Sequence, residues 1–208
     1  MTRHISSTSS EGPQEPRGSS GDVAFLVAHL DAAYNLARWL MRNEADAEDS
    51  VQEAYLRAAG HFAGFRGGDG RAWLLTIVRN ICYSRLSQKE ASGHTDFDEA
   101  IHSAAGRQTA SPETAVLLAE RTELVKKSLA GLPAEYREIL VLRELEQLSY
   151  REIANIEGIP LGTVMSRLSR ARRQLQQTLL DYNPAFVAPQ YPENAATLTS
   201  ETFQRFVE

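Results

Sequence analysis

The chain has little of what a disulfide-bonded, metal-binding or membrane-spanning protein needs. Its 208 residues include one cysteine, Cys82, so no internal disulfide and no thiolate metal cluster can form. The five histidines are scattered without the spacing of metal ligands. No apolar run is long enough to cross a membrane, and residues 1–21 lack the apolar stretch of a signal peptide. We therefore predict a cytoplasmic protein, not inserted in a membrane, that needs no metal or other cofactor.

The sequence also lacks the residue patterns of an enzyme active site. Cys82 lies on an apolar helix face, where a small core residue is expected rather than a nucleophile. The glycine cluster at residues 64–70 lacks the Lys-Ser/Thr pair that ends a phosphate-binding loop. We predict that the protein is not an enzyme.

The charge balance limits how the chain can bind nucleic acid. With 22 basic and 27 acidic residues, the formal net charge is -5. This excludes a protein coated in positive charge, so any contact with nucleic acid must come from a local basic patch.

Hydrophobic periodicity divides the chain into two helical blocks. Apolar residues recur at steps of three and four in residues 22–86 and 112–182, and sustained strand-like alternation is absent. Residues 1–21 are predicted to be disordered, residues 87–111 to form a flexible linker, and residues 183–208 to be a C-terminal extension. The sequence therefore predicts an all-α protein of two small helical domains, with three helices in the first and four in the second.

The strongest local pattern is a helix-turn-helix between Ser149 and Arg173. Ser149 and Glu152 have the spacing of a capping box, and Gly158 and Pro160 end the short helix that follows. The next helix carries four arginines and no acid between residues 161 and 177. A solvated surface is the alternative, but cap, turn and basic face together favour binding to duplex DNA. The candidate contacts on the outer face are Thr163, Ser166, Arg167, Arg170 and Arg173.

These motifs resemble those of the extracytoplasmic-function (ECF) sigma factors of bacteria. The stretches LPAEYR (132–137), LSYREIA (148–154) and GTVMSRL (162–168) resemble the promoter-binding C-terminal domain of that family, known as region 4. The stretches DAEDSVQE (46–53), AWL (72–74) and IVRN (77–80) resemble its other domain, region 2. The resemblance implies a protein that binds core RNA polymerase and directs promoter-specific initiation. The alternative is a helix-turn-helix regulator that does not bind the polymerase core.

The resemblance assigns the first domain two tasks. One face of its second helix is expected to bind the clamp helices of the polymerase β′ subunit, through Asp49, Gln52, Glu53 and Leu56. Without the resemblance, these acids would be read as a solvated face. The following region is expected to bind the melted minus-10 promoter element, through Phe62, Phe65, Arg66, Arg71, Arg79 and Asn80. We interpret Trp73 as a core residue, whereas for Phe65 base contact and core packing are equally favoured.

The resemblance also implies promoter DNA and a regulator as partners. The helix-turn-helix is expected to bind the minus-35 element as a duplex, while the linker spans the two promoter elements. An anti-sigma factor is the usual regulator in the family. Residues 183–208 extend beyond the family's usual end, and their aromatic residues suggest that they dock on a domain or a regulator.

Overall fold

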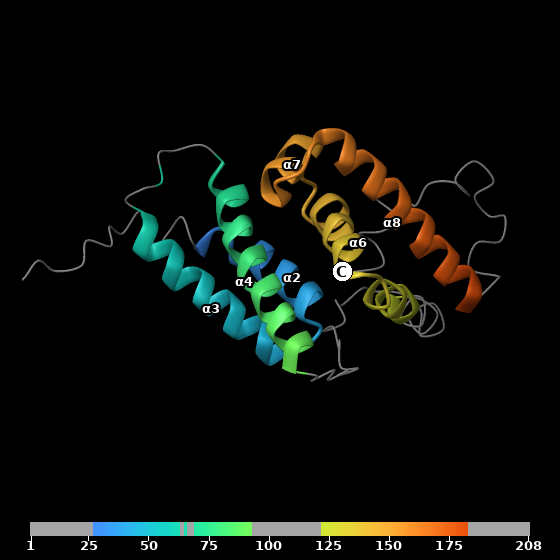
Figure 1. The fold of residues 1–208 in the computed structure, drawn as a ribbon, viewed down its shortest axis with the longest axis horizontal. Helices are drawn as coiled ribbons and strands as arrows, with labels where there is room; N and C mark the ends of the chain where they lie inside the picture. Colours follow the sequence, from blue (N-terminus) through green and yellow to red (C-terminus); the bar gives the residue numbers. More distant parts are fainter. Residues whose placement is uncertain (1–26, 63–64, 66–68, 93–121, 183–208) are drawn as a thin grey trace, which may run out of the picture.

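The computed structural model describes residues 27–62, 65, 69–92 and 122–182. These residues contain helices and connecting turns and no strand, which confirms the predicted all-α class (Figure 1). Residues 1–26, 93–121 and 183–208 lie outside the described part, as do residues 63–64 and 66–68. The predicted disordered segment, most of the linker and the C-terminal extension therefore lie outside it as well.

The first half contains the three expected helices, α2 (Leu30–Met41), α3 (Glu44–His61) and α4 (Gly70–Ser92). A tight turn joins α2 to α3, because Arg42 adopts a left-handed φ of 58°. Asn43 then caps α3, its side chain accepting a hydrogen bond of 3.0 Å from the Asp46 amide. Ala47, Val51, Ala54 and Ala58 give α3 its buried face.

Helix α4 continues to Ser92 and so enters the segment predicted to be linker from residue 87. Two contacts stabilise its last turns. Lys89 forms an ion pair with Asp46 of α3, and the Ser92 hydroxyl donates to the Lys89 carbonyl over 2.9 Å. The ion pair is not visible in helical periodicity, because it depends on how α4 lies against α3.

The second half begins with helical residues 122–130, followed by α6 (Ala134–Leu140). Helix α6 continues into the π-helical turn η2 (Val141–Leu145). The wider turn is closed by a 3.0 Å bond from the Glu146 amide to the Val141 carbonyl. Next come α7 (Tyr150–Glu157) and the long α8 (Leu161–Tyr182). The expected run of buried residues at 139–142 is present.

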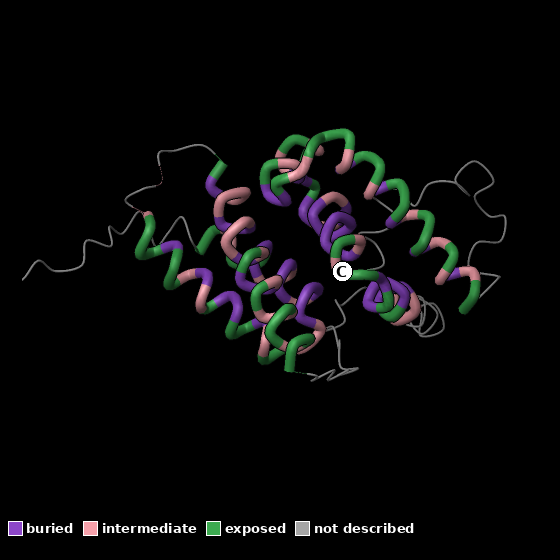
Figure 2. The backbone as a smooth tube through the Cα atoms, viewed as in Figure 1, coloured by how far each residue is buried: buried purple, intermediate pink, exposed green. Residues whose placement is uncertain are grey.

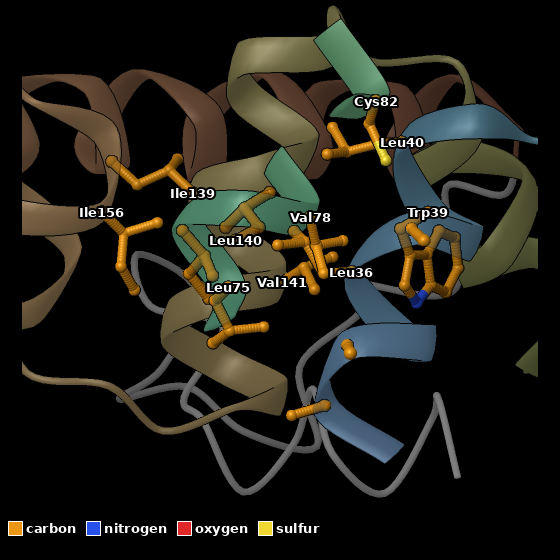
Figure 3. Close-up of a cluster of buried hydrophobic side chains, with 14 of the residues drawn as sticks. Leu36, Trp39, Leu40, Leu75, Val78, Cys82, Ile139, Leu140, Val141 and Ile156 are labelled. Carbon is orange, nitrogen blue, oxygen red and sulfur yellow. The ribbon is translucent and has the colours of Figure 1, made fainter. Parts of the chain in front are cut away.

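The two halves pack against each other through a continuous hydrophobic core. Helix α4 contacts α7, and α2 contacts both α6 and η2. Figure 2 shows buried residues on the facing sides of the two halves. In the close-up of Figure 3, Leu36 and Val78 of the first half lie beside Leu140 and Val141 of the second. Two helical units were expected, and the structure adds that they share one core.

Candidate polymerase and nucleic-acid interfaces

The helix-turn-helix has the predicted local geometry. The Glu152 amide donates to Ser149 Oγ at 3.3 Å, and the Ser149 amide donates to the Glu152 carboxylate at 2.6 Å, which completes the capping box. Hydrogen bonding of the Glu152 carboxylate to Ser149 lowers the pKa of Glu152, the Ser149 side chain contributing most and its backbone amide next. Gly158 ends α7 with a left-handed φ of 68°. Ile159 and Pro160 then connect Gly158 to α8, so the turn between the two helices is short.

The buried and outer faces of α8 also follow the sequence prediction. Val164, Leu168, Ala171 and Leu175 are buried. On the outer side Ser166, Arg170 and Arg173 are exposed, while Thr163 and Arg167 are half-buried. The outer side therefore presents exposed cations from the middle of the recognition helix.

Only two of the four α8 arginines are exposed in the structure. Arg167 is paired at 2.6 Å with the buried carboxylate of Glu157, and Arg172 is paired at 2.5 Å with that of Glu144. Within the described part of the chain, Arg170 and Arg173 make no recorded ion pair. The buried carboxylates therefore neutralise part of the positive charge predicted for residues 161–177. The positive charge that remains accessible to a partner is that of Arg170 and Arg173.

The proposed polymerase-binding face on α3 lies on the surface. Asp49 and Gln52 are exposed, Glu53 is half-buried, and Leu56 is 76% exposed. Arg85 of α4 lies 2.9 Å from the Glu53 carboxylate and 3.8 Å from that of Asp49. The hydrogen bond from Arg85 is the main reason that the pKa of Glu53 is lowered. Arg57 also lies 2.5 Å from the Glu53 carboxylate. Both acids of this face are therefore paired with arginines, and Leu56 is exposed at its edge.

The aromatic residues before and within α4 form a cluster. The ring of Phe65 lies 5.0 Å from that of Trp73, and Phe62 lies 5.8 Å from Phe65 and 6.1 Å from Trp73. All three are half-buried, so Trp73 packs as expected and Phe65 packs on it while keeping a partly open face. Asn80 is exposed, and Arg66 lies outside the described residues.

Two candidate DNA-binding arginines of α4 form ion pairs with acidic residues of the second half. Arg71 forms an ion pair with Glu146, which also accepts a 3.1 Å hydrogen bond from the side-chain amide of Asn35. Arg79 Nε lies 2.6 Å from an oxygen of Glu138, whose side chain is 0% exposed. The Arg79 contact lacks hydrogen-bond geometry and is therefore chiefly electrostatic. The other Glu138 oxygen accepts a 2.7 Å bond from the Tyr83 hydroxyl.

Comparison with known proteins decides the family. The sigma-70 region 2 model matches residues 25–91, and the sigma-70 region 4 model matches residues 122–175. The ECF RNA polymerase sigma factor SigW of Bacillus subtilis is 31% identical over 176 residues, which cover 81% of this chain and 94% of SigW. The chain belongs to the ECF sigma factors.

Other relatives agree with this assignment. The ECF sigma-E factor of Escherichia coli is 35% identical over 137 residues, covering 62% of this chain and 72% of the relative. The sigma factor RpoE of Bartonella quintana, solved in complex with the anti-sigma factor NepR, is 30% identical with a TM-score of 0.63. That match covers 79% of this chain and 99% of RpoE. CnrH, solved with the cytosolic domain of CnrY, shares the fold at 23% identity and a TM-score of 0.55, over 81% of this chain and 93% of CnrH.

Membership establishes the general function. ECF sigma factors direct transcription initiation and are regulators rather than catalysts, so the alternative of a regulator without polymerase binding is not favoured. Among the described residues, Cys82 is buried, and burial raises the pKa of its thiol to about 12. No group of three potential metal ligands occurs in that part of the chain. None of its helices combines the length and apolarity needed to span a bilayer.

The sequence did not identify the carboxylates that pair with the arginines of this sigma factor. Glu138, Glu144, Glu146 and Glu157 are all buried. One available signal was the position of Glu138 directly before residues 139–142, which were expected to be buried on several sides, because a buried carboxylate requires a cationic or hydrogen-bonding partner. Nothing in the spacing identified Arg79 as that partner, since 59 positions of sequence separate the two residues.

Proposed function

We propose that this sigma factor uses three surfaces, one to bind core polymerase, one to bind the minus-10 element and one to bind the minus-35 element. Residues 22–86, extended by the last turns of α4, bind core polymerase and the minus-10 element, and residues 112–182 bind the minus-35 element. The observation that carries the proposal is a surface of α3 with exposed Asp49, Gln52 and Leu56, in the same chain as an exposed basic helix-turn-helix. We also propose a cytoplasmic location and no enzymatic activity.

The core-polymerase contact is assigned to Asp49, Gln52, Glu53 and Leu56. Exposure of Leu56 supports this assignment, because a large apolar side chain that the described part of the chain leaves mostly exposed is available to a partner. The surrounding carboxylates favour a basic partner, as the β′ clamp helices of polymerase are expected to be.

The promoter contacts are assigned to two helices. Thr163, Ser166, Arg167, Arg170 and Arg173 are proposed to contact the minus-35 duplex from α8. The melted minus-10 strand is proposed to contact Phe62, Phe65, Arg66, Arg71, Arg79 and Asn80. Half-open aromatic rings favour stacking of unpaired bases, and arginines favour phosphate contacts. Because RpoE and CnrH were solved with protein regulators, we further propose an anti-sigma factor or a comparable regulator as a partner.

The central experiment is promoter-specific transcription with the full chain and core polymerase. Leu56→Ser is expected to weaken binding to core roughly ten- to a hundredfold, since burying a leucine contributes about 1.5–3 kcal/mol. Its free energy of unfolding should change by less than about 0.5 kcal/mol, as is usual for an exposed position. Tyr182→Ser, at an exposed apolar residue near the end of α8, is the matched control.

Three outcomes are distinguished. Loss of core binding in Leu56→Ser with the control unchanged supports the α3 face. Failure of the wild-type chain to bind core or to initiate at any promoter would contradict the proposed function as a whole, whereas normal binding by Leu56→Ser would contradict only the assigned face.

A further inference from the structure

The exposed side of the recognition helix α8 includes residues that the sequence prediction left out. In the first three turns the exposed residues come in adjacent pairs that recur every four positions: Leu161 and Gly162, Met165 and Ser166, and Ser169 and Arg170. Thr163 and Arg167, two of the candidate DNA contacts, are only half-buried neighbours of this side. Met165 and Ser169 were not among the candidates, and both are exposed on it.

Met165 is the largest exposed residue between positions 162 and 169. It is 53% exposed, and Leu161, one turn earlier, is 41% exposed. Residues four positions apart lie on the same face of a helix, so the two form one apolar surface. The other exposed residues of this stretch are Gly162, Ser166 and Ser169. Met165 therefore extends beyond neighbours that are all small.

Packing within the described chain does not require a glycine at position 162. Gly162 lies in the first turn of α8, and a Cβ added there would meet no heavy atom of the described chain within 4 Å. Its φ is not positive, and alanine would be the better helix former at such a position. A glycine does, however, let a partner approach the helix backbone closely. Gly162 therefore points to a partner that lies close to the first turn of α8.

The backbone that carries Met165 is held firmly. The Pro160 carbonyl accepts hydrogen bonds of 2.8 Å and 3.2 Å from the amides of Thr163 and Val164, which fix the first turn. Val164 and Leu168 are 0% and 1% exposed, so the helix is anchored in the core on both sides of Met165. The helix thus directs Met165 to one place, while its unbranched side chain can adapt to the surface it meets.

The major groove of DNA offers a specific apolar group to such a side chain. Among the base edges, thymine presents its C5-methyl group, which apolar side chains contact. In helix-turn-helix proteins, residues near the beginning of the recognition helix contact base edges. Arg170 and Arg173 are exposed farther along α8, where cations suit the phosphates of the same duplex. The exposed side therefore combines an apolar residue near its beginning with cations that follow it.

We propose that Met165 is a specificity-determining residue of this sigma factor, which contacts the C5-methyl group of a thymine in the minus-35 element. Leu161 extends the same apolar surface, and Gly162 lets the duplex approach the helix. The inference rests on the proposed binding of the minus-35 duplex by α8, and it adds the residue that selects thymine. Contact of Met165 with a protein instead of DNA is an outcome that the experiment detects.

The experiment removes the methyl group from the DNA. The holoenzyme, formed from the full chain and core polymerase, is used to enrich duplexes from a pool randomised over the upstream region. In the enriched duplex each thymine is then replaced in turn by deoxyuridine, which pairs with adenine in the same way but lacks the C5-methyl group. At one or two positions the replacement should weaken binding by the wild-type holoenzyme about fourfold, the factor expected for burial of one methyl group.

Met165→Ala removes the other side of the contact. It should bind the thymine duplex about four- to tenfold more weakly than wild type, and it should bind the thymine and deoxyuridine duplexes equally well. The losses from the two changes are then not additive, which is the mark of a direct contact. Val27→Ala is the matched control, because Val27 is an apolar residue of the first half that is 60% exposed. It should discriminate thymine from deoxyuridine as wild type does, and circular dichroism should show wild-type helix content in both variants.

Three results would overturn the inference. Equal discrimination by Met165→Ala and wild type would show that another residue contacts the methyl group. Wild-type binding that is insensitive to every deoxyuridine replacement would show that no residue does. Weaker binding of Met165→Ala to core polymerase, with discrimination unchanged, would assign Met165 to a contact with protein.

Failure of the proposed function gives a different result. If the wild-type chain does not bind core polymerase, or if the holoenzyme enriches no sequence, the proposed function fails and the role of Met165 fails with it. If the holoenzyme enriches a minus-35 sequence and initiates from it, while Met165→Ala discriminates as wild type does, the function stands and only the role of Met165 is wrong.

Discussion

Buried carboxylates determine much of the electrostatics at the residue scale. Glu138, Glu144 and Glu157 are each buried, and each is paired with an arginine. Burial of Glu157 raises its pKa to about 7, and repulsion from Glu138 raises it further. The pKa of Glu138 is also raised, again chiefly by burial, although Arg79 opposes the shift. The folded protein therefore holds protons that the unfolded chain would release.

Glu157→Gln is expected to reduce the pH dependence of stability. In the unfolded chain the Glu157 carboxyl has its ordinary pKa of 4.5, and in the folded chain a pKa of about 7. Its stabilising contribution is therefore fully present below about pH 4.5 and is lost as pH rises through 7. The variant should gain stability relative to wild type between pH 5 and pH 8, as measured by urea unfolding at each pH. A constant difference over that range would contradict the raised pKa.

Arg170→Ala is expected to weaken binding of a minus-35 duplex by about 1–3 kcal/mol. Arg170 is exposed on the outer side of α8, and its side chain can reach either a base edge or a phosphate. Binding is measured by fluorescence anisotropy at several salt concentrations, on promoter and unrelated duplexes. If Arg170 contacts only phosphate, all sequences weaken alike and the salt slope falls by about one.

Lys127→Ala provides the control for net charge, since Lys127 is exposed on the helix formed by residues 122–130. If Arg170→Ala and Lys127→Ala lose the same DNA-binding affinity, Arg170 contributes only through the net charge of the protein. Arg167 is a poorer test residue, because its removal leaves the buried Glu157 without its 2.6 Å partner and destabilises the fold as well.

At the scale of elements, the ends of the helices were largely predictable because they depend on neighbouring residues. The capping box at Ser149 and Glu152 and the glycine end of α7 followed from sequence and are present. The extension of α4 to Ser92 and the π turn η2 were not predicted. Each depends on contacts between elements, such as the pair of Lys89 with Asp46.

Ser149→Ala is expected to destabilise the protein by about 1 kcal/mol, with a range of roughly 0.5–2 kcal/mol for lost caps. The variant leaves the Glu152 amide without its side-chain acceptor at the start of α7. Urea unfolding at neutral pH gives the measurement. Ser84→Ala is the control, because the Ser84 hydroxyl bonds the Asn80 carbonyl in the exposed interior of α4, where alanine is the better helix former. A loss no greater than that of the control would show that the cap contributes nothing.

At the scale of the whole molecule, the shared core makes the halves thermodynamically dependent on each other. Leu75 of α4 and Leu140 of α6 are both buried beside the interface (Figure 3). Both tryptophans, Trp39 and Trp73, lie in the first half. Tryptophan fluorescence therefore reports the first half, while circular dichroism reports all helices.

Leu168→Ala is expected to destabilise both halves by about 2–5 kcal/mol, the usual cost of a cavity at a buried leucine. Leu168 is 1% exposed within α8, far along the chain from both tryptophans. The tryptophan and circular dichroism transitions should shift together, because the halves unfold cooperatively. Met165→Ala, at an exposed position of the same helix, should change stability by less than about 0.5 kcal/mol. An unmoved tryptophan transition would mean that the halves unfold independently.

The candidate face on α3 was assigned by resemblance to a family, because its acids alone would be read as a solvated face. The residue patterns alone determined the all-α class, the helix-turn-helix and the outer face of α8. These features depend on periodicity, caps and turns, which are properties of short stretches of chain. Tertiary structure alone decided that Arg167 and Arg172 lie against Glu157 and Glu144, and that Arg71 and Arg79 lie against acids of the other half. A pair between distant residues depends on how helices pack, and periodicity within a helix carries no information about which side chain it will meet.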